Sequence, residues 1–276
     1  EGRYGITLRM GYSYNRYLSQ SWNYNLARRW VGDTWSESSW YVLDQKGKSL
    51  LSQIGTTLMY DRRDNRMAPR KGYYVSAGVD FAGLGGDEKY VRGKINGAYY
   101  VPLDDLTNSH NWTLAFRGGA GYLGDWGNGR HDIIDNFYLG GNNLRGFLDG
   151  GAGPRTVGVT DHSSEDLIGG RFMYNASVQL NFPLPFLTDM GVAGRVFSDM
   201  GSLAGLRVKR LYTDAATAGS RYTPVTGDSL TPRWSAGAGV SWKSPFGLLN
   251  IDLGVPIMRS RNDRTQLLRF GFGQQF

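Results

Sequence analysis

The chain of 276 residues has a mean hydropathy of −0.41. It contains no apolar run of about 18 residues, which excludes a membrane protein built from spanning helices. Its 31 Lys and Arg against 24 Asp and Glu give a formal charge of +7, a balance that can indicate a nucleic-acid partner. The absence of cysteine is compatible with an exported bacterial protein, and 40 glycines with 13% aromatic residues suit a β-barrel with bulky lipid contacts and a crowded interior.

Eleven segments of the chain alternate between apolar residues and polar or small ones, as a β-strand with two unlike faces does. They are residues 3–14, 20–30, 50–61, 71–81, 89–102, 112–123, 171–182, 190–200, 233–243, 247–257 and 265–276. In the first segment the apolar positions are Tyr4, Ile6, Leu8, Met10, Tyr12 and Tyr14. Most segments have the length of about 9 to 12 residues that a tilted strand needs to cross a bilayer.

The polar face of these strands carries charged residues, so it must face water. A soluble barrel or sandwich has the opposite arrangement, with its large residues inside. The pattern therefore predicts an all-β fold, a transmembrane antiparallel β-barrel of the outer-membrane type. Because many cations lie on the inward face or in loops, we expect a basic lumen or contacts with anionic lipids and no nucleic-acid partner. The inward cations are Arg9, Arg92, Lys94, Arg117, Arg195 and Arg269.

The connections between the predicted strands alternate in length. Short turns follow residues 14, 61, 102, 182 and 243, whereas the longer loops are residues 31–49, 124–170 and 201–232 and the shorter ones 82–88 and 258–264. Turns on the periplasmic side and loops outside are the layout of outer-membrane barrels. Single-chain bacterial barrels normally have an even number of strands. A count of eleven therefore indicates either that a strand is merged or missed here or that the sequence begins partway through a larger barrel, and we favour the second interpretation.

The last predicted strand, 265–276, has the clearest alternation. Leu268, Phe270, Phe272 and Phe276 share one face, and the other face is small or polar. An aromatic residue at the end of such a strand is typical of a membrane barrel, because it anchors the strand at the lipid–water interface.

The longest loop carries the most specific motif. Residues 135–147 read Asp-Asn-Phe-Tyr-Leu-Gly-Gly-Asn-Asn-Leu-Arg-Gly-Phe. This segment resembles the Arg-Gly-Phe segment in the long sixth loop of BamA-type outer-membrane assembly proteins. Further landmarks of that family follow in the same order at residues 60–64, 69–73, 101–103 and 197–201.

The resemblance covers essentially the whole chain and implies one domain. Residues 1–276 would form the C-terminal part, eleven strands, of a sixteen-strand barrel, without the first strands and the periplasmic polypeptide-transport-associated domains. The implied function is to fold and insert β-barrel proteins into the bacterial outer membrane through a lateral seam. Its implied partners are unfolded outer-membrane proteins as clients, outer-membrane lipids, and accessory lipoproteins of an assembly complex.

The resemblance also implies roles for single residues. Arg145 would enter the lumen and meet Asp199 on the barrel wall, since a guanidinium fork matches a carboxylate. Gly146 would allow a backbone conformation closed to other residues, and Phe147 would anchor the loop tip. Gln179 stands where the family often has a second acid, so the sequence implies one acid at that contact.

The C-terminal signal and seam would consist of Leu268, Phe270, Phe272, Gly273 and Phe276. Gly273 matches the glycine at which the last strand of the family can kink, and glycine weakens a strand interior. The same glycine also fits a second interpretation, in which a small residue is needed in a crowded lumen.

Signals for catalysis are poor. Residues 119–124 match G-x-G-x-x-G, but they end a predicted strand and no helix follows. His110, His131 and His162 lie singly in turns or loops, without the spacing of metal ligands. We therefore expect no enzyme activity, no catalytic residues, no cofactor and no metal.

Two other functions remain open. Relatives that translocate polypeptides, in two-partner secretion or autotransporter assembly, share the Arg-Gly-Phe loop. A diffusion porin needs a constricting loop lined with opposed charges, whereas the long loop here has few charges and a glycine-rich tip.

Overall fold

The computed structural model describes residues 2–31, 42, 45–108, 111–127, 131–156, 165–187, 190–206, 225–244 and 247–272. Its main feature is one eleven-stranded antiparallel sheet, which contains every strand that the alternation predicts. In sheet order the strands are β1 (Gly2–Ser13), β2 (Leu18–Val31), β3 (Gly47–Asp61), β4 (Gly72–Ala82), β5 (Tyr90–Pro102), β6 (Thr113–Asp125), β9 (Phe172–Pro183), β10 (Val192–Ala204), β12 (Ser229–Ser244), β13 (Gly247–Met258) and β15 (Leu268–Phe272). The predicted fold class is confirmed.

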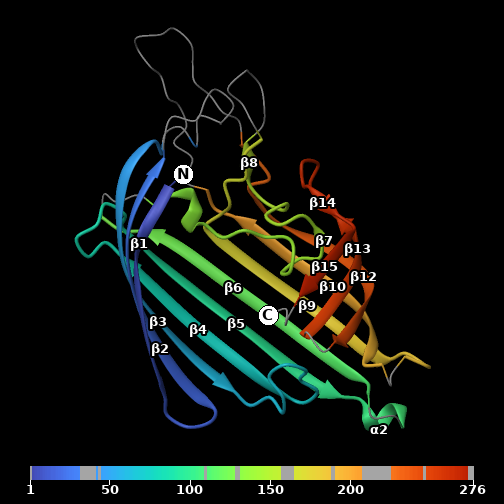
Figure 1. Cartoon of the computed structure of the whole chain (residues 1–276). Helices are drawn as coiled ribbons and strands as arrows, with labels where there is room; N and C mark the ends of the chain where they lie inside the picture. Colours follow the sequence, from blue (N-terminus) through green and yellow to red (C-terminus); the bar gives the residue numbers. More distant parts are fainter. Residues whose placement is uncertain are drawn as a thin grey trace.

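The sheet is curved, and residues 131–156, between β6 and β9, lie on its concave side (Figure 1). Two short ladders lie outside the main sheet, one between β7 (Gly146–Phe147) and β14 (Thr265–Gln266) and one between β8 (Arg155–Thr156) and β11 (Val225–Thr226). In the part of the chain that the structure describes, β1 and β15 form the two edges of the sheet.

The two faces of the sheet differ sharply in polarity. On β13, Ile251 and Leu253 are 41% and 53% exposed on the outer face, whereas Asp252 between them is 1% exposed on the inner face. Most of the other strands repeat this alternation, whereas at the edge strand β1 both faces are exposed from Gly5 to Ser13. The exposed aromatic side chains of this pattern include Trp22, Trp30, Phe116, Trp234, Trp242, Phe270 and Phe272. A continuous apolar surface of this kind is the lipid-facing band of a membrane barrel.

We expect a fluorescent label at Leu253→Cys to be quenched strongly by brominated lipids, and a label at Ser241→Cys to be quenched weakly. Leu253 lies on the exposed apolar face, whereas Ser241 lies on the polar face, where its hydroxyl donates a hydrogen bond to Asn250 at 2.8 Å. The absence of native cysteine makes both labels site-specific. Equal quenching of the two labels in a bilayer would contradict the assignment of the faces.

The helices of the described residues are short, and none has the length and apolar character needed to span a bilayer. One of them, α2 (Asp104–Thr107), lies in the short connection that the sequence predicts after residue 102. Asp104 accepts a hydrogen bond from Arg70 at 2.7 Å, so it is held by a neighbouring turn. The α-helical turn satisfies backbone groups that an open turn would leave to water.

The largest apolar cluster around the long loop lies on the inner side of the sheet. It consists of Leu139, Leu144, Phe147, Ala152 and Leu203, all fully or almost fully buried. Four of these five residues belong to the loop, so the loop forms its own small core against β10. This core fixes the loop on the sheet and positions the arginine at its tip.

Candidate functional site

Residues 131–156, here called the arginine loop, form a compact turn that presents Arg145 to the sheet. Asn143 shapes this turn, because its side chain accepts a hydrogen bond from the Gly140 backbone at 2.8 Å and donates one to the Tyr138 carbonyl at 3.2 Å. Gly140 and Gly141 have φ values of 133° and 65°, which only glycine adopts readily. The glycine-rich sequence before Arg145 is therefore the local cause of the loop's shape.

Arg145 makes a two-pronged contact with Asp199 of β10. Its Nε lies 2.7 Å from Oδ2 and its Nη2 lies 2.7 Å from Oδ1, and its backbone N–H also donates to Oδ2 at 3.1 Å. The two residues are 2% and 1% exposed. A paired fork of this geometry combines charge with orientation, and lysine cannot reproduce it.

Three further groups complete the environment of the Arg145 guanidinium. The Gln179 side-chain oxygen accepts a hydrogen bond from Nη1 at 2.8 Å, and the Ser177 hydroxyl accepts one from Nη2 at 3.2 Å. The guanidinium carbon also lies 3.5 Å from the centre of the Phe197 ring, a cation–π contact. The structure thus brings Arg145, Asp199 and Gln179 together.

A second acid near this contact comes from β13. Asp252 lies 4.0 Å from Nη1 of Arg145, and it pairs with both nitrogens of the Arg195 fork at 2.7 and 2.6 Å. Two arginines and two aspartates therefore alternate across β10, β13 and the loop. Asp252 is not among the site residues predicted from the sequence. Its inward position on β13, which matches that of Asp199 on β10, was the available signal.

Gly146 and Phe147 fix the rest of the loop tip. Gly146 has a φ of 89°, and a side chain there would lie about 3.2 Å from Ser235 and Gly254. Phe147 is buried in the apolar cluster of the loop. The family resemblance assigns these two residues a special backbone conformation and an apolar anchor, and both roles stay predictions.

The loop tip is also joined to the C-terminal part of the chain. Gly146 and Phe147 of β7 pair with Gln266 and Thr265 of β14, which directly precede the last strand. Arg269 of β15 adds side-chain contacts, with Asn142 at 2.8 Å and Asp149 at 3.0 Å. No sequence pattern predicted this connection between the arginine loop and the last strand.

The beginning of the arginine loop is held by a separate charged cluster. Arg29 of β2 bonds both oxygens of Asp135, at 2.6 and 3.0 Å, and Glu88 at 2.9 Å. Burial raises the pKa of Glu88 to about 9, and the charges of Asp135 and Asp132 act in the same direction. Burial would also raise the pKa of Asp135, but the hydrogen bond and charge of Arg29 outweigh it and hold this pKa below its usual value.

We expect the protein to lose stability as the pH rises from neutral towards about 9, because the folded state holds a proton on Glu88 that the unfolded chain has released at its ordinary pKa of about 4.3. The free energy of unfolding therefore decreases with pH throughout this window. Glu88→Gln keeps the side chain neutral and should flatten the slope. Denaturant unfolding in micelles at several pH values measures the slope of the free energy of unfolding against pH. Asp105→Asn is the control, because Asp105 is exposed. An unchanged slope in Glu88→Gln would contradict the assignment.

The predicted seam residues lie only partly within the described residues. Leu268, Phe270 and Phe272 of β15 are exposed on the apolar face, and their strand pairs with residues 249–253 of β13. Gly273 and Phe276 lie outside the described residues. β13 and β15 pair antiparallel, as the predicted antiparallel barrel requires.

Of the three histidines, only His131 lies in the described part of the chain. It is not isolated there, since its two ring nitrogens contact Asp125 and Asn136. The described residues contain no group of three or more His, Cys, Asp or Glu side chains placed to hold a metal ion.

An antiparallel sheet with an apolar outer face, and with a loop pinned to its polar inner face by a buried arginine, defines a β-barrel membrane protein whose lumen holds an internal loop. A model of the Omp85 superfamily domain matches residues 1–276. The chain belongs to the Omp85 superfamily, and the resemblance to BamA-type proteins is confirmed.

Individual relatives agree with this assignment. The outer membrane protein assembly factor BamA of Neorickettsia risticii is 29% identical over 97% of this chain and 33% of its own length. A sorting and assembly machinery component 50 homolog of Bos taurus is 26% identical over 94% of this chain and 54% of its own length. The crystal structure of BamA from Haemophilus ducreyi lacking POTRA domains 1–3 matches 97% of this chain and 53% of that one, with a TM-score of 0.79 and 24% identity, and supports the fold.

The chain spans about a third of the length of the bacterial relative and about half of that of the bovine one. The bacterial and animal relatives together indicate a family of outer-membrane proteins, bacterial or mitochondrial.

Proposed function

We propose that this chain is part of a factor that folds β-barrel proteins and inserts them into a bacterial outer membrane. The observation that carries the proposal is the buried contact of Arg145 with Asp199 and Gln179, which holds the arginine loop on the inner face of the sheet. The relatives named as assembly factors support it. Insertion of this kind needs binding and release and no covalent chemistry.

The proposed mechanism uses the edge of the sheet that β15 forms within the described residues. There, Leu268–Phe272 of β15 pair with Leu249–Leu253 of β13, and no further strand pairs with β15 among the described residues. An edge strand offers unpaired N–H and C=O groups, which an incoming strand can pair with. We infer that β15 lies at a lateral seam, where client strands add to the sheet and then leave into the membrane.

The partners follow from this mechanism. Unfolded outer-membrane proteins would be the clients, and outer-membrane lipids would contact the apolar face that includes Phe270 and Phe272. Accessory lipoproteins would complete an assembly complex. The relatives' names support an assembly role and do not identify these lipoproteins.

The nearest alternative is a relative that passes a polypeptide through the lumen. It shares the loop motif, so the Arg145 contact does not distinguish the two functions. A diffusion porin is the third possibility, and the arginine loop with its own apolar core opposes it because such a loop fills a lumen.

Reconstitution of the intact protein in liposomes distinguishes the three functions. An assembly factor accelerates the folding of an added unfolded barrel protein in the vesicle membrane. A polypeptide transporter delivers an added chain to the vesicle interior, and a porin releases a small trapped solute. Passage of the chain or release of the solute, without faster folding of the client, would refute the proposal.

The seam has a test of its own. A photo-crosslinking amino acid in place of Phe270 on β15 should capture client chains during insertion, because it lies beside the free edge. The same amino acid in place of Ile95 on β5 is the matched control, since Ile95 is also exposed and apolar but lies within the sheet between β4 and β6. Equal capture at both positions would remove the seam from the mechanism.

A further inference from the structure

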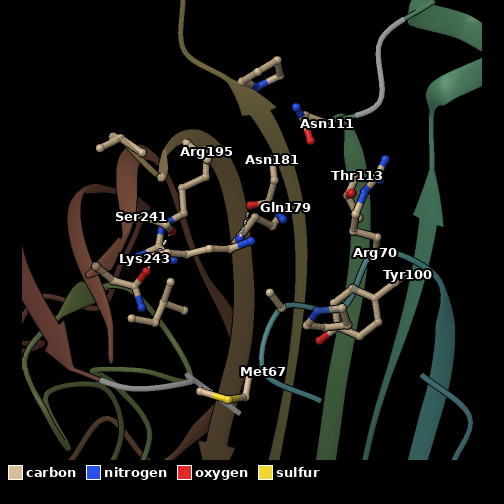
Figure 2. A pocket seen from close by; sticks show the side chains of 18 of the residues that line it. Met67, Arg70, Tyr100, Asn111, Thr113, Gln179, Asn181, Arg195, Ser241 and Lys243 are labelled. Atoms are coloured by element: carbon tan, nitrogen blue, oxygen red, sulfur yellow. Dashed lines mark hydrogen bonds between the residues drawn. The ribbon is translucent and has the colours of Figure 1, made fainter. Parts of the chain in front are cut away.

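A cavity of about 260 Å³ lies on the inner face of the sheet, at the end where the short turns are. Its wall comes from β5, β6, β9, β10, β12 and β13, and the segment 67–70 between β3 and β4 also lines it. Figure 2 shows Arg70, Thr113 and Tyr100 on one side and Ser241, Lys243 and Arg195 on the other, with Gln179 and Asn181 between them. We call it the turn-side cavity.

The charged residues of the turn-side cavity are all positive. They are Arg70, Arg117, Arg195 and Lys243, and no Asp or Glu belongs to the lining. The positive charges of Arg70 and Arg195 are already neutralised by ion pairs with Asp104 and Asp252, respectively. Lys243 forms no ion pair within the described residues, and Nε of Arg117 is buried without a hydrogen-bond partner. Two positive side chains of the cavity thus remain for an anionic ligand.

The remaining lining is a mixture of apolar and amide side chains. Tyr100, Val192 and Leu248 provide apolar surface, and Asn181 and Asn250 provide hydrogen-bonding amides. A peptide carries apolar side chains, amide groups and carboxylates together, so it can satisfy all three kinds of surface. A membrane lipid is a poor fit, because the cavity lies on the polar face of the sheet and the lipid-facing surface is the opposite one.

We propose that the turn-side cavity binds a carboxylate-bearing segment of an unfolded polypeptide. Arg117 and Lys243, which lie on different strands of the wall, would each bind a carboxylate of the segment, since guanidinium and ammonium groups make charge-assisted hydrogen bonds to it. The side-chain N–H groups of Asn181 on β9 would donate hydrogen bonds to the peptide backbone. That the segment belongs to a client protein rests on the proposed assembly function, whereas the cavity and its charges do not.

The cavity also touches the residues that hold the arginine loop. Gln179 lines the cavity and accepts a hydrogen bond from Arg145, and Arg195 lines it and pairs with Asp252. A ligand in the cavity would therefore lie beside two of the residues that hold the loop on the sheet.

The test uses the intact protein in a neutral detergent and a coumarin-labelled, end-capped peptide of sequence Gly-Asp-Leu-Glu-Gly. Fluorescence anisotropy should show binding that weakens with added salt. The peptide Gly-Asn-Leu-Gln-Gly has the same shape without charge and should bind at least about tenfold more weakly, as should the acidic peptide to the double variant Arg117→Met, Lys243→Met. Because no client folds in this experiment, its failure is distinct from failure of the assembly function.

Matched variants keep the result interpretable. Lys94→Met removes an exposed inward cation of β5 that does not line the cavity, and it should leave binding unchanged. Arg117→Lys with Lys243→Arg keeps both charges and should retain binding. Equal binding of the two peptides, or unchanged binding in the methionine variant, would overturn the proposal. Displacement of the peptide by an equal concentration of inorganic phosphate would overturn the assignment to a peptide.

Discussion

Arg145→Ala should release the arginine loop from the sheet and slow client insertion at least about tenfold, while the sheet stays folded. Breaking one partner of a buried ion pair costs about 3–5 kcal/mol, and a hydrated lumen reduces this cost. The free energy that the hydrated contact loses still favours the released loop, because each 1.4 kcal/mol shifts the equilibrium between bound and released loop about tenfold. Protease sensitivity of the loop and the rate of client folding in liposomes measure the two effects.

Two variants give this prediction its controls. Arg145→Lys keeps the charge but loses the fork that bonds both oxygens of Asp199, so it should restore little activity. Arg264→Ala breaks an ion pair with Glu165 that is about half exposed on both sides, and such pairs contribute little. A wild-type insertion rate in Arg145→Ala would show that the contact has no part in assembly.

Gly254→Ala should displace the loop tip without removing any charged group. An added Cβ at this position would lie 2.7 Å from the Gly146 nitrogen and 3.0 Å from its Cα. These are backbone atoms, so the loop itself must move, and overpacking of this kind costs about 1–3 kcal/mol. Client insertion should fall as it does in Arg145→Ala.

Gly93→Ala is the matched control, because a Cβ there meets nothing within 4 Å. It changes a glycine of β5 to the same residue and should leave the loop and its protease sensitivity unchanged. If Gly254 and Arg145 act through the same contact, the double variant should be little worse than either single one. Fully additive losses would show that the two residues act independently.

The local parts of this structure could be predicted from the sequence. Strict alternation places Asp252, Asn250 and Gly254 on one face of β13 and Ile251 on the other, because successive side chains of a strand point to opposite faces. The same rule puts Asp199 inside. Its choice as the partner of Arg145 came from the family resemblance, since alternation alone does not say which inward residue a loop meets.

The contacts between distant segments could not be predicted in this way. Arg29 and Asp135 are 106 residues apart in the sequence and bond through their side chains. The pairing of Arg195 with Asp252 depends on the register between β10, β12 and β13. The second acid near Arg145 was missed for this reason. The family resemblance implies a second acid at the position of Gln179 on β9. The acid that lies near Arg145 is Asp252 on β13, and only the folded sheet brings β13 close to the loop.

The ladder between β7 and β14 determines the order in which this protein can fold. Its partners, Gly146–Phe147 and Thr265–Gln266, are far apart in the chain, and contacts of such separation form late because a large loop must close first. A chain synthesised from its N-terminus therefore cannot complete the backbone pairing of its loop tip until its last segment has arrived. The ladder therefore distinguishes a complete chain from a truncated one. A copy truncated before Thr265 would retain most of its strands but leave the tip of its arginine loop unpaired.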